Sequence, residues 1–481
     1  MPNYSMKDRG NRTIYDYLYQ CIREDILSGR LSAGERLPSK RLLARELNIS
    51  VTSVENAYAQ LVLEGYIHGE AGRGFFVNDL VEPVPFREAA RPFAPKVLAR
   101  QEETAPARVL DFKANRSSVE HFPFATWSKL MRTVLSERNA AILATVPYNG
   151  LYELRSALSA YLYRHRGIET DPEQIIIGAG TEYLYSRLLQ VLGFNTVMAM
   201  EDPGYKKFSE ISASQGTVWD YIPMDDDGMR IDYLRNSSAN VIHVSPSNHF
   251  PTGTVMPITR RFQLLQWARE KPERYIIEDD YDSELRYAGR IIPPMYAIDE
   301  AEKVIYMNTF SKSLVPSIRI SYMILPPYLL ERYQDTMSFY SCTVSSFEQL
   351  TLAHFISEGY FSRHINRMKQ IYKQKRDLIL GALKNSELSS ISEIREANAG
   401  THFLLHVNTS LTDKQIKEKA KEQNIELALL SDYTRHQGLK SMGTLIINYA
   451  GLEPDQVNLA IEIIERVFEN DIAKSKTKLT S

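Results

Sequence analysis

The sequence predicts an α/β protein with two parts: a winged helix-turn-helix head, and a large body built on a mostly parallel sheet with helices on both faces. Three observations predict this organisation. Residues 1–80 hold three helical patterns followed by two short strand patterns. Residues 81–109 contain five prolines and charges of both signs, which predicts an extended linker. From residue 110 onward, apolar strand-like runs alternate with helical patterns, as in a parallel sheet covered by helices.

Composition excludes several classes of protein. The chain has 481 residues, of which 43% are hydrophobic and 24% charged, typical of a globular protein with more than one domain. Its two cysteines are too few for a disulfide framework or a cysteine metal cluster, so we expect a cytoplasmic protein without a metal site. No signal peptide is evident, and no apolar run approaches the roughly 18 residues that span a bilayer. The net charge of −2 does not by itself indicate nucleic-acid binding.

The head is predicted to contain three helices and a β-wing. Apolar residues recur every four positions over residues 14–26, which predicts the first helix. Ser39 and Ser50 each precede a helical pattern and are the expected N-caps of the second and third helices. Residues 66–67 and 75–77 predict two strands around a glycine-rich turn. This order of elements is that of a winged helix-turn-helix.

Polar side chains on the third predicted helix favour DNA binding. Thr52, Ser53 and Asn56 lie opposite its apolar stripe, where short side chains of a recognition helix reach base edges in the major groove. Arg73 lies at the tip of the predicted wing, in position for phosphate or the minor groove. The start of the second helix adds further expected contacts to double-stranded operator DNA: Ser39, Lys40 and Arg41. A winged helix that binds a protein is the alternative.

The run from Tyr306 to Arg319 predicts a covalent cofactor site. Lys312 follows small hydroxyl residues at the end of an apolar strand pattern, and Arg319 lies seven residues further on. A lysine in this position can form a Schiff base with pyridoxal 5'-phosphate, which makes Lys312 the candidate catalytic residue. Thr309, Ser311 and Arg319 can bind the phosphate dianion.

Other strand ends supply the remaining groups that this cofactor needs. Asp279 and Tyr281 are two residues apart after an apolar run, so on an extended segment they point the same way. The aspartate can keep the pyridine nitrogen protonated, and the tyrosine can hydrogen-bond the ring 3-oxygen. Gly180 and Thr181 open a helix whose backbone N–H groups can bind a phosphate, and Tyr205 can stack on the ring. Each motif alone also fits an ordinary surface loop or helix cap, but together they favour a pyridoxal phosphate site.

Two stretches of the chain resemble known families. Residues 31–41, Leu-Ser-Ala-Gly-Glu-Arg-Leu-Pro-Ser-Lys-Arg, resemble the head of the GntR family of bacterial regulators. Residues 178–319 resemble fold-type I pyridoxal-phosphate enzymes of the aminotransferase class. The second resemblance covers roughly residues 110–470, of which residues from about 390 to 470 have the pattern of a smaller C-terminal α/β subdomain. Together the two stretches resemble the MocR/GabR-type regulators.

The resemblance implies a division of labour along the chain. Residues 1–80 would be the DNA-binding domain, 81–109 the linker and 110–481 the aminotransferase-like domain that binds pyridoxal phosphate. In such regulators the body senses a small molecule for the head, and two chains form a domain-swapped homodimer.

Two positions depart from the family patterns. Val51 stands where the GntR family usually has an arginine after the capping serine of the recognition helix. Ser247 stands where aminotransferases carry an asparagine before Pro-Thr-Gly, and Asn248 and His249 are the candidate replacements.

The sequence leaves the effector and the reaction open. Residues 443–450 lack the arginine that normally binds a substrate carboxylate, and Lys207 and Arg435 are the candidate effector-binding cations. The effector is therefore either an amine or amino acid, or pyridoxal phosphate itself. The main hypothesis is a transcription regulator that depends on pyridoxal phosphate. The alternatives are an active aminotransferase with an accessory winged-helix domain, and a scaffold that binds no cofactor.

Overall fold

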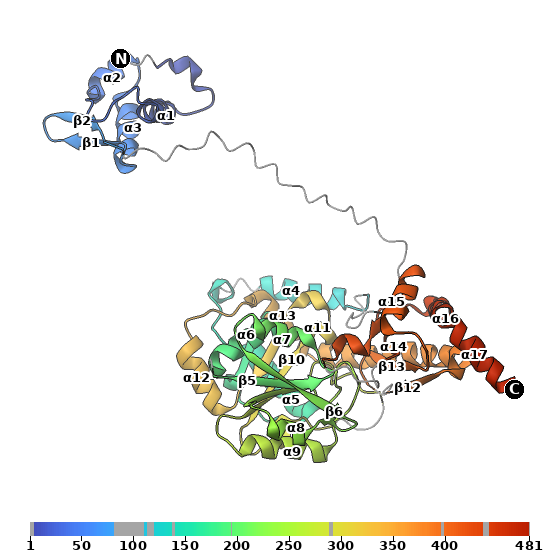
Figure 1. The fold of residues 1–481 in the computed structure, drawn as a ribbon. Coiled ribbons are helices and arrows are strands. Elements are labelled where there is room, and N and C mark those ends of the chain that lie inside the picture. The colour runs from blue at the N-terminus through green and yellow to red at the C-terminus, as the bar shows by residue number, and fades with distance from the viewer. Residues whose placement is uncertain are drawn as a thin grey trace. The chain divides into compact units, whose positions relative to one another are not determined.

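The computed structural model describes residues 4–80, 110–112, 120–136, 140–193, 195–287, 292–395, 399–435 and 442–480. The chain divides into two compact units, Met1–Pro106 and Ala107–Ser481 (Figure 1), and each is described by itself. The predicted linker, residues 81–109, lies outside the described residues. No described helix is both long and apolar enough to cross a membrane.

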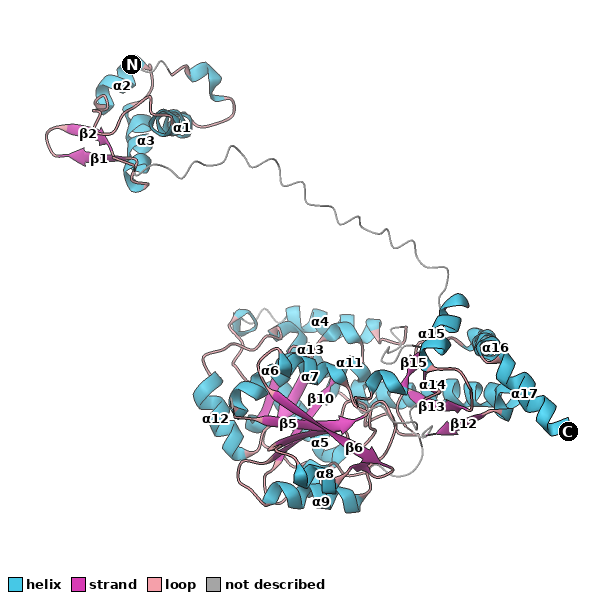
Figure 2. Ribbon diagram, viewed as in Figure 1, coloured by secondary structure: helices cyan, strands magenta, loops and turns pink. Residues whose placement is uncertain are grey.

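The first unit is a winged helix-turn-helix, as the sequence predicts. After the short helix η1 (Met6–Arg9) come α1 (Ile14–Leu27), α2 (Lys40–Glu46), α3 (Val51–Leu63) and the antiparallel strands β1 (Ile67–Glu70) and β2 (Gly74–Val77) (Figure 2). Both predicted N-caps are confirmed, because Ser39 accepts a hydrogen bond from Leu42 N–H and Ser50 accepts one from Ser53 N–H. The core that joins the three helices is formed by buried side chains, among them Leu18, Leu43, Val54, Tyr58 and Leu61.

The second unit is built on an eight-stranded mixed sheet with the order β4-β11-β10-β9-β8-β5-β6-β7. The central strands β10, β9, β8, β5 and β6 pair in parallel, whereas β11 is antiparallel to both of its neighbours and β7 is antiparallel to β6. The strands are β4 (Ile175–Gly178), β5 (Val197–Asp202), β6 (Val218–Asp225), β7 (Gly228–Met229), β8 (Val241–Val244), β9 (Tyr275–Asp279), β10 (Val304–Thr309) and β11 (Ser321–Ile324). The α/β fold class with a mostly parallel sheet is therefore confirmed.

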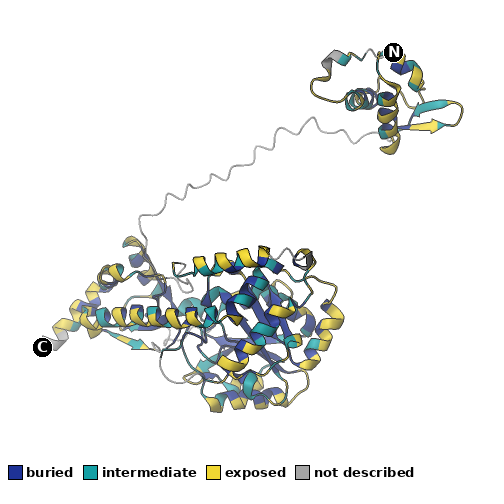
Figure 3. Cartoon of the chain, turned by 180° about the vertical axis from the view of Figure 1, so that it is seen from behind, coloured by how far each residue is buried: buried dark blue, intermediate teal, exposed yellow. Residues whose placement is uncertain are grey.

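Helices cover both faces of this sheet (Figures 1 and 2). Successive residues of one strand enter different cores: Ile175 and Ile177 pack in one hydrophobic cluster and Ile176 in another. This alternation is that of a strand buried on both faces. The covering helices are α4 (Phe124–Ser136), α5 (Tyr152–Arg166), α6 (Thr181–Leu192), α7 (Lys206–Ala213), α8 (Ile231–Asn236), α9 (Ile258–Arg269), α10 (Met295–Ile298), α11 (Phe310–Ser313), α12 (Pro327–Met337) and α13 (Ser346–Ser357). Figure 3 shows the result, with buried strands inside and exposed outer helix faces.

A smaller α/β part forms the C-terminal end of the second unit. Its four-stranded antiparallel sheet has the order β12-β13-β16-β15, and a separate parallel pair joins β14 to β3. The strands are β3 (Leu110–Asp111), β12 (Ser392–Arg395), β13 (His402–Val407), β14 (Ile425–Glu426), β15 (Ala428–Leu429) and β16 (Thr444–Asn448). The helices are α14 (Tyr360–Asn385), α15 (Asp413–Glu422), α16 (Val457–Val467) and α17 (Glu469–Thr480).

Candidate functional site

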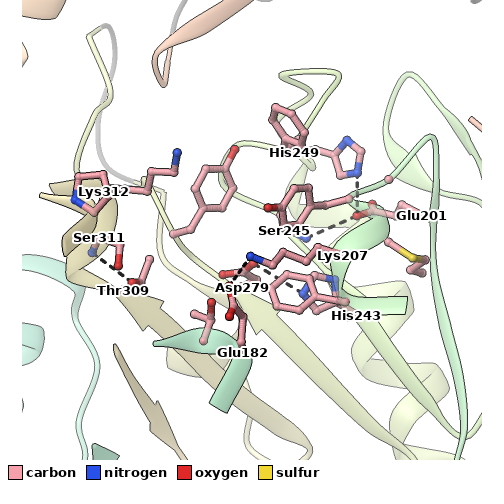
Figure 4. Close-up of a pocket in the computed structure, with 18 of the residues that line it drawn as sticks. Glu182, Glu201, Lys207, His243, Ser245, His249, Asp279, Thr309, Ser311 and Lys312 are labelled. Carbon is pink, nitrogen blue, oxygen red and sulfur yellow. Dashed lines mark hydrogen bonds and ion pairs between the residues drawn. The ribbon is translucent and has the colours of Figure 1, made fainter. Parts of the chain in front are cut away.

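A pocket of about 210 Å³ lies where the parallel strands of the large sheet end. Its lining comes from the loops after β4, β5, β8, β9 and β10, the edge at which ligands bind in open α/β sheets. Figure 4 shows these side chains converging on one space. Ten of the residues singled out in the sequence line it: Thr181, Tyr205, Lys207, His249, Asp279, Tyr281, Thr309, Ser311, Lys312 and Arg319.

Asp279 Oδ1 and Ser311 Oγ are among the buried polar atoms of this pocket that have no hydrogen-bond partner among the described residues. The other carboxylate oxygen of Asp279 lies 3.7 Å from His243 Nε2. The His243 ring packs against Phe208, with the ring centroids 4.8 Å apart. This packing restricts the position of the imidazole beside the carboxylate. An unpaired buried polar atom costs free energy of about 1–3 kcal/mol. These atoms therefore mark places where a ligand can supply the missing hydrogen bonds.

Lys312 lies in the short helix α11, directly after the end of β10. Thr309 caps this helix by accepting a hydrogen bond from Ser311 N–H at 3.1 Å, and Ser321 Oγ donates to Thr309 Oγ1 at 2.8 Å. The lysine keeps part of its surface open to the pocket, but protein surrounds it elsewhere. This burial lowers the pKa of Lys312 to about 8, an effect that the nearby Asp282 opposes. A reactive neutral amine is consequently accessible close to neutral pH.

Gly180 and the Arg319 side chain lie very close to each other. A Cβ at Gly180 would lie 2.3 Å from Arg319 Nη2, and Gly180 has a φ of +95°. Glycine is thus required here both for the backbone conformation and for space. Gly180 precedes α6, so the guanidinium and the first N–H groups of that helix lie together, as an anion-binding site requires.

Glu182, which the sequence reasoning missed, lies between two of the predicted cations. Its carboxylate forms an ion pair with Lys207 and lies 3.6 Å from Arg319 Nη2. The hydrogen bond from Lys207 is the main reason that the pKa of Glu182 lies below its usual value. The three side chains are between 40% and 48% exposed. A glutamate that follows Gly180 and Thr181 at the start of a helix was the available signal.

Arg435, the other candidate effector-binding cation, does not line this pocket. Its guanidinium lies 4.7 Å from the centroid of the Tyr221 ring, and its backbone N–H donates to Asp202 Oδ1 at 2.8 Å. Gly204 N–H donates to Tyr433 O at 3.0 Å. The segment that carries Arg435 is thus hydrogen-bonded to the loop that follows β5.

The loop after β8 distributes its polar residues among different partners. Ser247 accepts a hydrogen bond of 3.5 Å from Arg166, and Asn248 donates one of 2.6 Å to Asp282. Of the residues 247–249, His249 is the one that lines the pocket, with its Nε2 3.4 Å from a carboxylate oxygen of Glu201. Burial raises the pKa of Glu201 to about 8 and lowers that of His249 to about 3.

A buried ion pair, which sequence spacing did not indicate, supports the segment that carries Asp279 and Tyr281. Arg166, the last residue of α5, donates to Asp280 Oδ2 at 2.5 Å, and Tyr306 Oη donates to the same oxygen at 2.7 Å. Burial alone would raise the pKa of Asp280, but the Arg166 charge and the hydrogen bonds to the carboxylate together outweigh it, and the pKa lies below its usual value. Asp280 is the residue between Asp279 and Tyr281, so this network fixes the segment that bears both.

Some of the predicted DNA-contact residues of the head are exposed, whereas others are engaged in helix caps or ion pairs. Arg41, Thr52 and Asn56 are exposed, whereas Ser53 Oγ lies 2.8 Å from Ser50 Oγ within the N-cap of α3. Ser39 is likewise occupied as the cap of α2. Two further predicted residues form ion pairs on the surface of the head: Arg73 with Glu70 at 2.5 Å and Lys40 with Glu55 at 2.6 Å.

Comparison with known families matches both units. Residues 14–77 match the family described as bacterial regulatory proteins, gntR family, and residues 107–464 match aminotransferase class I and II. Several bacterial proteins resemble nearly the whole chain, among them the following two. The uncharacterized HTH-type transcriptional regulator YdeL of Bacillus subtilis is 38% identical over 464 residues, which cover 95% of this chain and 98% of that protein. The probable rhizopine catabolism regulatory protein MocR of Rhizobium meliloti is 32% identical over 462 residues, covering 94% and 93%.

A solved structure shares the fold of the body. The kynurenine aminotransferase of Pyrococcus horikoshii superposes with a TM-score of 0.67 at 23% identity, covering 76% of this chain and 92% of that one. At this identity the likeness establishes the fold of the body alone.

Proposed function

The chain belongs to the MocR-type subfamily of the GntR family of bacterial regulators, and on that premise we propose that the ligand state of its body pocket controls how its head binds operator DNA. Residues 1–80 would be the DNA-binding domain, 81–109 the linker and 110–481 the sensing domain. The protein would act in the cytoplasm as a domain-swapped homodimer, so that two heads meet two operator half-sites.

The residues of the pocket fit pyridoxal phosphate as the resident cofactor. Asp279 Oδ1 is buried without a partner and is suited to a protonated ring nitrogen. Ser311 Oγ, also without a partner, would bind the phosphate together with Thr309 and Arg319. Lys312, whose pKa burial lowers to about 8, is the amine that would hold the cofactor covalently. When bound, the cofactor supplies an electron-withdrawing ring that can exchange amines at this lysine.

The remaining predicted contacts complete the same site. Tyr281 would donate to the ring oxygen, and burial, which raises its pKa well above the usual value, keeps its proton in place. Tyr205 would lie against the ring. Its neighbours Phe208 and Phe250 meet it edge-on with centroid separations of 5.6 Å, which restrict its position. Gly180 and Thr181 would bring α6 N–H groups to the phosphate.

One observation favours sensing over turnover: the cofactor end of the pocket is complete, whereas among the described residues that line the pocket no arginine besides Arg319, assigned to the phosphate, is available for a substrate carboxylate. Lys207 pairs with Glu182, and Arg435 lies over Tyr221. An effector with a carboxylate must therefore displace an existing ion pair, and a lysine holds a carboxylate with less geometric specificity than an arginine. An amine without a carboxylate, an amino acid that displaces Glu182, and pyridoxal phosphate itself are the effectors compatible with this pocket.

Control of the head then follows from linkage. An effector shifts the dimer between two conformations only by the difference of its affinities for them. A tenfold change in operator affinity needs a difference of about 1.4 kcal/mol.

An active aminotransferase is the second candidate function, and the lowered pKa of Lys312 is the observation that favours it. A lysine that is neutral near physiological pH can also move a proton on a bound substrate. Turnover also requires a substrate and a keto acid to bind in turn.

The visible absorbance of the purified protein separates the two functions. We expect a band above the protein absorbance that shifts on adding one amine from a panel and then persists, and the same amine should change operator affinity. Conversion of the band to a shorter wavelength, with recovery on adding a keto acid, would establish turnover and contradict the sensor.

Operator binding tests the other half of the proposal. Arg41→Ala should weaken binding of a duplex from the promoter region of neighbouring genes, because it removes an exposed cation from the expected phosphate-contact surface. Glu210→Gln, in α7 of the body, is the control and should leave binding unchanged. Equal binding by the Arg41 variant and the wild type would remove this helix from the DNA interface.

A further inference from the structure

The outward face of α3 carries an unusual set of side chains. The buried side of this helix is formed by Val54, Ala57, Tyr58 and Leu61. Over the first nine residues of α3, the exposed residues recur at positions i, i+1, i+4, i+5 and i+8, which places them together on one side of the helix. These residues, the reading face, are Val51, Thr52, Glu55, Asn56 and Ala59.

The reading face has no positive charge. The sequence of α3, VTSVENAYAQLVL, contains neither lysine nor arginine, and Glu55 is its one charged residue. The commonest base-specific contact, a bidentate arginine or lysine on guanine, is therefore not available from this helix. A carboxylate at this position also approaches DNA phosphates, which is unfavourable unless the charge is compensated.

Lys40 provides that compensation. Its Nζ lies 2.6 Å from Glu55 Oε1 and 5.5 Å from the centroid of the Phe75 ring in β2. The lysine is 31% exposed and the glutamate 54%. A cation held by an aromatic face and an ion pair loses less freedom on binding than a mobile one. Within the described part of the head, Oε2 of Glu55 has no hydrogen-bond partner, so one carboxylate oxygen remains for a base.

We propose that Glu55 reads a cytosine in each operator half-site and that Lys40 positions it and neutralises its charge. The inference rests on the proposed function, since it names the base that the head recognises. In the major groove guanine presents N7 and O6, and thymine presents O4, all acceptors that repel a carboxylate. Adenine presents its N6 donor beside the N7 acceptor, whereas cytosine presents the N4 donor without a neighbouring acceptor. Cytosine is thus the base that an anionic acceptor distinguishes best.

The other members of the reading face complete a half-site of defined chemistry. Asn56 is suited to adenine N6 and N7, and the small apolar side chains of Val51 and Ala59 are suited to thymine methyl groups. Lys40 forms an ion pair with Glu55, so its role extends beyond binding a phosphate: it also holds the carboxylate that contacts the base. Lys40 is accordingly a positioning residue for Glu55.

The test is selection of binding sites from a randomised duplex library by the full-length protein with pyridoxal phosphate present. Binding sites are selected in parallel with the wild type, with Glu55→Gln and with Glu24→Gln. Glu24 is exposed on α1, so its variant makes the same change of net charge away from the reading face. Thermal unfolding of each variant shows that the head is folded.

We expect the wild type to select cytosine at one position of each half-site, with a loss of roughly five- to hundredfold in affinity when that base is changed. Glu55→Gln should select adenine at the same position, since glutamine pairs with adenine N6 and N7, whereas Glu24→Gln should keep the wild-type site. Lys40→Met should weaken binding of the selected site more than binding of random duplex.

Two outcomes would contradict the proposal, and they distinguish a wrong assignment of Glu55 from a wrong function. If Glu55→Gln selects the same site as the wild type, base by base, the assignment of Glu55 is wrong and operator binding by the head stands. If the wild type enriches no sequence at all, with and without the panel of amines, the proposed function itself fails.

Discussion

The two ends of the body pocket differ in how their polar groups are satisfied. At the deep end (Asp279, Ser311, Lys312), two buried atoms have no partner among the described residues and a lysine has a pKa lowered by burial to about 8. At the mouth (Glu182, Lys207), two exposed charges pair with each other. The unpaired atoms at the deep end cost free energy that a ligand can offset by forming hydrogen bonds. The charged groups at the mouth are already paired without a ligand.

The difference indicates where each kind of ligand acts. Buried unsatisfied atoms cost about 1–3 kcal/mol each, so a ligand that supplies their hydrogen bonds binds the deep end strongly. Exposed ion pairs are worth only about 0–1 kcal/mol, so a ligand can exchange them readily. We infer a long-lived cofactor at the deep end and an exchangeable effector at the mouth.

The largest expected effect is at Lys312. Lys312→Ala should abolish the visible absorbance of the purified protein, because no other described lysine combines this position in the pocket with a pKa near 8. Lys303→Ala is the control, since its ammonium group donates to Pro272 O at the protein surface. Spectra recorded before and after addition of pyridoxal phosphate, followed by borohydride reduction and peptide mapping, measure the effect. A reduced adduct at the wild-type level in Lys312→Ala would show that a different amine holds the cofactor.

The next effect concerns the support of the deep end. Arg166→Met should lower the free energy of unfolding by about 3–5 kcal/mol, because it leaves the buried Asp280 carboxylate without its cation. Arg395→Met removes the cation of an exposed pair with Glu393, whose side chains are 52% and 61% exposed, and should cost under about 1 kcal/mol. Urea unfolding of the apo protein measures both. Similar losses for the two variants would mean that the Arg166 pair contributes no more than a surface pair.

The deep end was predictable from the sequence and the mouth was not, for a physical reason. Asp279, Tyr281 and Lys312 follow directly after apolar strands, and parallel strands bring their carboxyl ends to one edge, so their convergence follows from local patterns. The Glu182–Lys207 pair joins the starts of two helices 25 residues apart, and sequence spacing does not specify that approach. The same limit applies to Arg166 and Asp280, which are 114 residues apart. In the head, helix caps were predictable, but the ion pair of Lys40 with Glu55 was not.

The pH dependence of cofactor capture tests the deep end more finely. Burial lowers the pKa of Lys312 to about 8, so the neutral amine is a minor species below that pH. The rate of capture should rise about tenfold per pH unit from pH 6 to 7 and level off above pH 8. Stopped-flow absorbance of the apo protein mixed with pyridoxal phosphate follows it. A lysine with an ordinary pKa would instead give a rate that still rises tenfold per pH unit at pH 9. That result would contradict the lowered pKa of Lys312.

The smallest expected effect is at the mouth of the pocket. Its measurement decides whether the Glu182 carboxylate competes with anionic ligands for the neighbouring cations. Glu182→Gln removes the negative charge beside Arg319 and Lys207, so an anion no longer has to displace a carboxylate. Since exposed pairs contribute about 0.2–1 kcal/mol, affinity for inorganic phosphate should rise by up to about fivefold. Glu210→Gln on α7 makes the same charge change at an exposed position and serves as the control, with titration calorimetry on apo protein as the measurement. Weaker phosphate binding by Glu182→Gln would mean that the glutamate holds the two cations in place for the anion rather than competing with it, and the mouth would then be as preorganised as the deep end.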